Sequence, residues 1–132
     1  MVLGRGVRIF TARWFGRFAR RERINDASLK EAIERAERGL VDAELGGGIV
    51  KQRVARPGQG RSGGYRVLVA YRRASRAVFL YGFAKQERDN IGPDELATLR
   101  EIGAAWLDAS APEMARALED DALQEVAVGD TE

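Results

Sequence analysis

Apolar residues follow two different periods along the chain, one typical of helices and one typical of strands. A short apolar run at residues 7–10 predicts an edge strand. Apolar side chains then recur at the spacing of one helix face, at Trp14, Phe15, Phe18 and Ala19. Because Thr11 is of a type that caps helices, we predict a helix that follows it and runs to about Arg23.

A second helix is predicted shortly after the first. Residues 25–26 break the apolar pattern, and Ser28 with Glu31 fits a capping box. Gly39 marks the end of this helix. Two short helices with a tight break between them predict a helical hairpin.

The period then changes to two. Residues 49–55, 65–71 and 77–83 alternate in the manner of strands, and the short connection at 72–75 predicts a hairpin. A helix is expected to open at Gly92-Pro93. The order strand–helix–helix–strand–strand–strand–helix predicts an α+β fold, with the helices on one face of a small, mainly antiparallel sheet.

The end of the chain is expected to be only partly structured. Ser110 and Glu113 form another capping box, which predicts a short acidic helix to about Leu118. We expect a frayed tail beyond this helix.

Charge is distributed unevenly between the two halves of the sequence. Residues 1–88 hold 20 Lys and Arg against 8 Asp and Glu, whereas residues 89–132 hold 2 against 12. Such asymmetry is typical of a nucleic-acid-binding body followed by an acidic segment. A solvated surface that merely segregates its charges is the plainer alternative.

Composition excludes several classes of site. The chain has no cysteine and no histidine, so we expect no disulfide, no zinc site and no cofactor, and the usual general base is absent. No apolar run approaches the roughly 18 residues that a membrane span needs. We see no signal peptide either, and expect a cytoplasmic protein.

A glycine-rich stretch lies between the strands predicted at residues 49–55 and 65–71. Residues 58–63 read Gly-Gln-Gly-Arg-Ser-Gly, but a strand rather than a helix follows, so a dinucleotide site is not predicted. The expected structure is a long hairpin loop, with contact to a nucleic-acid backbone as the functional alternative.

Basic residues on the strands give a more specific signal. Lys51 and Arg53 are two apart and point to one face, while Arg66 lies on the next strand. Residues 51–88 hold 10 basic residues and one acidic residue, Glu87. A sheet face of one charge repels itself, which favours an anionic partner. Arginine suits the stabilisation of phosphoryl charge, and Lys51 is a candidate for proton transfer.

Two segments of the sequence and a short N-terminal run together resemble a known protein family. Residues 40–72 and 81–91, with the Phe-x-Arg-Phe-Ala-Arg run at 15–20, are similar to the RelE superfamily of bacterial toxins in its HigB-like branch. The resemblance covers about residues 7–108. It implies a RelE/ParE-like fold over residues 1–108, with residues 109–132 as an acidic C-terminal extension, partly helical or disordered. It also implies an endoribonuclease that cuts mRNA on the ribosome and is held inactive by a cognate antitoxin.

The resemblance also implies roles for single residues. The catalytic set would be Lys51, Arg53, Arg66 and Lys85. Contacts with RNA or the ribosome are expected from Arg56, Arg61, Arg72 and Arg88. Residues 89–92 lack the tyrosine that family members carry there, so the candidates for proton transfer are Tyr65, Tyr71, Tyr81 and Glu87.

Two other functions stay open at this stage. ParE-like relatives share the fold and act on DNA gyrase, and a non-catalytic RNA-binding module would also carry a basic face. Lys51, Arg53 and Arg66 on one face favour the nuclease.

Overall fold

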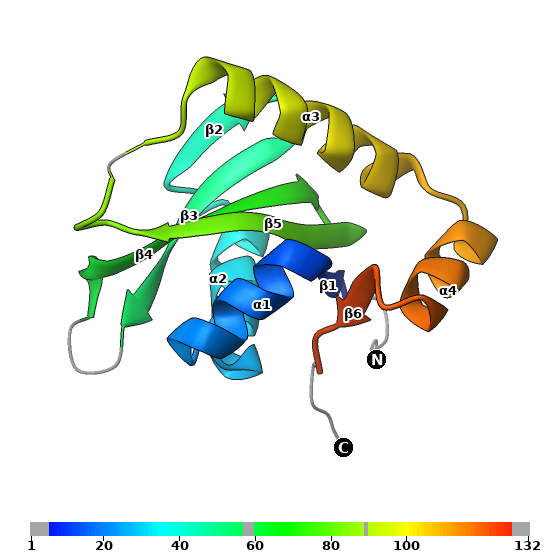
Figure 1. The fold of residues 1–132 in the computed structure, drawn as a ribbon, viewed down its shortest axis with the longest axis horizontal. Helices are drawn as coiled ribbons and strands as arrows, with labels where there is room; N and C mark the ends of the chain where they lie inside the picture. Colours follow the sequence, from blue (N-terminus) through cyan, green and yellow to red (C-terminus); the bar gives the residue numbers. More distant parts are fainter. Residues whose placement is uncertain (1–5, 57–59, 89, 128–132) are drawn as a thin grey trace.

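The computed structural model describes residues 6–56, 60–88 and 90–127, which form a six-stranded sheet between two layers of helices (Figure 1). In chain order the elements are β1 (Arg8–Ala12), α1 (Arg13–Glu22), α2 (Asp26–Glu37), β2 (Ala43–Gly46), β3 (Ile49–Arg56), β4 (Gly60–Arg72), β5 (Arg76–Ala84), α3 (Pro93–Asp108), α4 (Ala111–Glu119) and β6 (Leu123–Glu125). None of the helices in the described part is long and apolar enough to span a membrane.

The sheet has the strand order β2-β3-β4-β5-β1-β6. β1 runs parallel to β5, and the other neighbouring strands are antiparallel. The predicted α+β class with a mainly antiparallel sheet is therefore confirmed. The prediction that residues 7–10 form an edge strand is wrong, because β6 pairs with the free side of β1.

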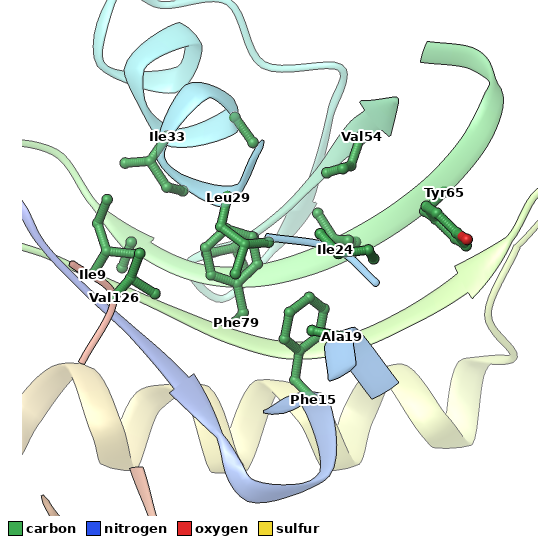
Figure 2. Close-up of a cluster of buried hydrophobic side chains, with 14 of the residues drawn as sticks. Ile9, Phe15, Ala19, Ile24, Leu29, Ile33, Val54, Tyr65, Phe79 and Val126 are labelled. Carbon is green, nitrogen blue, oxygen red and sulfur yellow. The ribbon is translucent and has the colours of Figure 1, made fainter. Parts of the chain in front are cut away.

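Helices cover both faces of the sheet, which corrects the expectation of one covered face. The hairpin of α1 and α2 packs on what we call the hairpin face, while α3 and α4 pack on the α3 face (Figure 1). Each face has its own apolar core, because most of the central strand positions are buried on both sides. Figure 2 shows the core of the hairpin face, where Leu29 and Ile33 of α2 lie near Phe79 of β5.

A buried polar network ties α2 to the edge of the sheet. The side chain of Gln52 is fully buried, donates to the carbonyls of Ala32 (2.9 Å) and Leu40 (3.1 Å), and accepts from the amide of Asp42 (2.8 Å). The buried Arg35 donates to Glu31 and to the carbonyl of Arg53. Since buried polar groups cost free energy unless they are paired, this network fixes the position of β3 against α2.

Glycines in the Gly-rich stretch have structural roles. β4 already begins at Gly60, so the predicted loop is shorter than expected, and its residues 57–59 lie outside the described part. The β3–β4 register shifts between Val54 and Arg56, and a Cβ on Gly64 would lie 2.2 Å from the Val54 carbonyl oxygen. Only glycine fits opposite this bulge.

Two predicted helix starts and the expected tail need correction. The N-cap of α1 is Ala12 without a side-chain cap, because Thr11 belongs to β1, and α2 is capped by Asn25 rather than Ser28. The Ser110–Glu113 capping box of α4 is confirmed. The frayed tail is wrong for residues 123–125, which form β6.

We predict that Gly64→Ala destabilises the fold by about 2–3 kcal/mol, since the added methyl group would have to displace backbone atoms of β3. Urea denaturation measures the change. The matched control is Gly6→Ala, where a Cβ would have nothing within 4 Å. Equal denaturation midpoints for the two variants would contradict the close approach.

A second prediction concerns acid stability. Burial opposes ionisation of Asp42, but hydrogen bonds from Arg53 outweigh it and hold the pKa of Asp42 below its usual value. The ionised carboxylate therefore stabilises the fold above the unfolded pKa of about 3.9, and this contribution is lost as the pH falls further. Asp42→Asn should reduce the loss of unfolding free energy between about pH 5 and 2.5. Glu44→Gln, which removes an exposed carboxylate from the same edge, should leave it unchanged.

Candidate functional site

The α3 face carries the basic residues that the sequence singled out. Arg53 of β3 lies directly opposite Arg66 of β4, and Lys51 lies opposite Leu68. Cα atoms of such cross-strand pairs are about 5 Å apart, so the two guanidinium groups belong to one small patch. The end of this face with Ile49 and Ala70 is covered by α3, which packs there through Gly103.

Arg53 is held in place by a carboxylate at the edge of the sheet. Its amide donates to Asp42 (2.7 Å), and its guanidinium donates to the other oxygen of the same carboxylate (3.1 Å). The Arg53 side chain is nevertheless 46% exposed. Asp42 thus orients the cation and leaves much of it open to solvent.

The neighbouring strand β5 adds aromatic residues to the same face. Phe83 lies opposite Arg66, and Tyr81 lies opposite Leu68. Arg88 lies over the Phe83 ring, with its guanidinium carbon 5.5 Å from the ring centre, and forms an ion pair with Glu95 (2.8 Å). This pair raises the pKa of Arg88 and lowers that of Glu95. Arg88 is therefore engaged within the protein, although it borders the patch.

Trp14 extends this aromatic group and was missed as a functional candidate. It was predicted on the buried face of the first helix, yet the residue is 41% exposed. Its ring stacks on Tyr81 with centroids 4.6 Å apart and an interplanar angle of 25°. The sequence signal was its place between Arg13 and Arg17 at the border of the apolar stripe.

Two of the tyrosine candidates lie on the opposite face of the sheet. Tyr65 donates to Glu22 (3.0 Å), and Tyr71 donates to Glu37. Burial first, and then these hydrogen bonds, raise the pKa of both hydroxyls. The alternation of β4 separates both tyrosines from Arg66, which leaves Tyr81 as the candidate tyrosine on the α3 face.

The remaining candidates are spread over the molecule. Arg56 lies over the Tyr65 ring, on the hairpin face. Arg72 is at the far end of β4, where it donates to the Leu107 carbonyl (2.9 Å) and pairs with Asp108 (3.0 Å), so it caps α3. Lys85 and Glu87 are exposed in the segment after β5. The side chain of Arg61 lies outside the described part.

We define the basic–aromatic patch as Lys51, Arg53, Arg66, Tyr81 and Trp14. Lys85 is exposed in the segment after β5, and the ring of Phe83 is buried beneath Arg88. Its cations suit a phosphate, and its aromatic rings suit a base. Within residues 6–56, 60–88 and 90–127, no three side chains of metal-binding type gather to hold an ion. Side chains of the types in the patch are chemically suited to charge stabilisation, proton transfer and stacking.

In a comparison with protein-family models, residues 7–126 match the RelE toxin of the RelE/RelB toxin–antitoxin system. Comparisons with curated proteins and with solved structures gave no match. The matched range includes every described strand and helix, α4 and β6 among them. The chain belongs to the RelE family of toxins from toxin–antitoxin systems.

Proposed function

We propose that this toxin is an endoribonuclease of the HigB-like branch that cuts mRNA on the ribosome and thereby stops translation in the cytoplasm. The observation that carries the proposal is the placement of Arg53 opposite Arg66 on a partly open sheet face. The cross-strand pair brings two guanidinium groups to one place on the sheet, and guanidinium groups bind phosphate oxygens with paired, charge-assisted hydrogen bonds.

The chemistry assigned to the patch is attack by a ribose 2′-oxygen on the adjacent phosphorus. A bond forms between the 2′-oxygen and phosphorus, the bond to the 5′-oxygen breaks, and a cyclic phosphate and a free 5′-hydroxyl result. Arg53 and Arg66 would stabilise the charge that develops on the phosphoryl oxygens. The 2′-hydroxyl would lose its proton to water as its oxygen bonds to phosphorus, and the ammonium group of Lys51 or Lys85 would donate a proton to the leaving 5′-oxygen.

Ribosome dependence follows from the weakness of this set. The sequence has no histidine, and Tyr65 and Tyr71 lie on the other face, so none of these groups can serve as the general base at Arg66 in the described part of the chain. A substrate that is already held in register needs less help from the enzyme, because orientation alone lowers the barrier considerably. The ribosome would supply that orientation.

The aromatic end of the patch is proposed to hold a base of the message. Trp14 and Tyr81 form a stacked pair at the border of the cations, and unpaired bases commonly stack on such rings. This pair would take the place of the tyrosine that is missing at residues 89–92.

Membership of the family implies a cognate antitoxin. We propose that the antitoxin neutralises the toxin by occupying the basic–aromatic patch, where an acidic or groove-filling segment would find complementary charge.

Arg66→Ala and Lys51→Ala should each reduce mRNA cleavage in a translation extract by about 10²-fold or more, because charge stabilisation or proton transfer is lost. Primer extension on the message measures the cleavage. Arg73→Ala, which removes an exposed arginine from the β4–β5 turn, is the matched control and should cut normally. Thermal denaturation of each variant confirms that it is folded.

The same translation extract distinguishes a ribosome-dependent nuclease from a gyrase inhibitor. Purified mRNA without ribosomes should be cut poorly, and plasmid topology should not change. Altered supercoiling without cleavage would replace the nuclease with a gyrase inhibitor, and full activity of both alanine variants would refute the assigned site.

The stacking role predicts a fluorescence change. The chain has two tryptophans, so in Trp106→Phe all tryptophan emission comes from Trp14. A non-cleavable 2′-O-methyl RNA should quench this emission, and Trp14→Leu should weaken its binding by about 1–3 kcal/mol, the value of one stacked base. In Trp14→Phe the remaining Trp106 emission should not respond. Quenching that is absent at saturating RNA would remove Trp14 from the site.

A further inference from the structure

A second polar site lies on the molecule, apart from the basic–aromatic patch. A cavity of about 280 Å³ opens between α1, the end of β1 and β6, and three arginines of α1 line it: Arg13, Arg17 and Arg20. Arg13 is engaged with the backbone carbonyls of Asp120 (2.8 Å) and Asp121 (3.2 Å). Arg17 is exposed and makes no hydrogen bond or ion pair to another described residue, so its charge is available to a ligand.

A buried hydroxyl points to a ligand in this cavity. Thr11 lines it, is only 7% exposed, and has no hydrogen-bond partner for its side chain among the described residues. Nearly all buried polar side chains have a partner, and each exception needs an explanation. A bound group with oxygen atoms would supply the missing partner.

A missing side chain leaves room for that group. A Cβ on Gly16 would lie 3.5 Å from Nη1 of Arg20, 3.6 Å from Oγ1 of Thr11 and 3.8 Å from Oε1 of Gln124. Polar atoms from α1, β1 and β6 therefore converge on the glycine of α1, where Arg20 donates to Gln124 (3.4 Å).

The start of α1 adds to the attraction for an anion. The N-cap Ala12 provides no side-chain acceptor, and the first turn contains no acidic residue. Helix N-termini carry partial positive charge, which favours a negative group, although the first amide of α1, that of Arg13, already donates to the Ala122 carbonyl (3.1 Å).

We propose that this cavity binds a phosphate group through the Thr11 hydroxyl and the guanidinium groups of Arg17 and Arg20. Guanidinium groups recognise phosphate with paired, charge-assisted hydrogen bonds. Asp121 is the acidic residue of the lining and weakens the site by repulsion.

The phosphate comes from an RNA backbone or from the free ion. The RNA source rests on the proposed function: Arg17 follows Trp14 by three residues, so both lie on neighbouring positions of the exposed helix surface. A strand that stacks a base on Trp14 would pass the cavity with its backbone. Affinity of the cavity for phosphate itself does not depend on the nuclease assignment.

The test measures binding of a non-cleavable 2′-O-methyl RNA 12-mer by fluorescence anisotropy over a range of salt concentrations. Thr11→Val, Gly16→Ala and Arg17→Gln should each weaken binding about tenfold. The slope of log affinity against log salt should fall by about 0.7, the value for one phosphate contact on a single strand.

Asp121→Asn should tighten binding several-fold. Asparagine tolerates the positive φ of 60° at this position. Arg73→Gln, with the same loss of charge elsewhere, should keep the wild-type slope.

Gly16→Ala is the variant that we expect to fold normally, because its Cβ would make only ordinary van der Waals contacts and alanine favours a helix. In a second arm, inorganic phosphate replaces chloride at constant ionic strength, and the rise in Tm is compared between wild type and Gly16→Ala.

A Tm response that Gly16→Ala abolishes, with RNA affinity unaffected by the variants, assigns the site to the free ion. An effect of the variants on RNA binding assigns it to the backbone. If neither arm separates the variants from wild type, the site is refuted. If RNA binding responds while wild type cuts no mRNA on ribosomes, the phosphate site stands and the nuclease assignment fails.

Discussion

The buried amide of Gln52 determines how the central strands present their charges. The amide bonds to α2 and to the segment before β2. These bonds require that the face of β3 with Gln52 lies against the helices α1 and α2. Because side chains alternate along a strand, inward Gln52 places Lys51 and Arg53 outward on the α3 face. A slip of one residue would bury both cations and expose Val50 and Val54 of the core. One neutral, fully bonded side chain thus secures the orientation of the charged ones.

Local patterns in the sequence were sufficient for most of the elements but not for their arrangement. The strands β1, β3, β4 and β5 and all four helices follow from the apolar period, and the capping residues of α4 were predicted correctly. The side of the sheet on which α3 packs depends on how the chain crosses over after β5, and no local period encodes that. β2 and β6 are too short, at 4 and 3 residues, to produce a recognisable alternation.

The candidate site could be predicted in part, because local patterns place some of its residues but not the elements that meet there. Alternation along β3 places Lys51 and Arg53 on one face, and alternation along β4 separates Tyr65 from Arg66. The position of Arg66 opposite Arg53 depends on the register between the two strands. Trp14 required knowledge of where α1 begins relative to the end of β5. The charge asymmetry indicated nucleic acid, yet part of it is internal, because Arg8, Arg72 and Arg88 pair with acidic residues of the C-terminal half.

The position of β1 between β5 and β6 has a consequence for biosynthesis. Arg8 and its partner Glu125 are 117 residues apart, so the first strand to be made is the last to be enclosed. Contacts of such separation are slow to form, since the long loop between them must first close. During synthesis the N-terminal segment therefore emerges without either neighbouring strand, and the apolar side of α1 stays exposed until β5 has been translated. The toxin acquires its complete sheet only after β6 (Leu123–Glu125) has been translated.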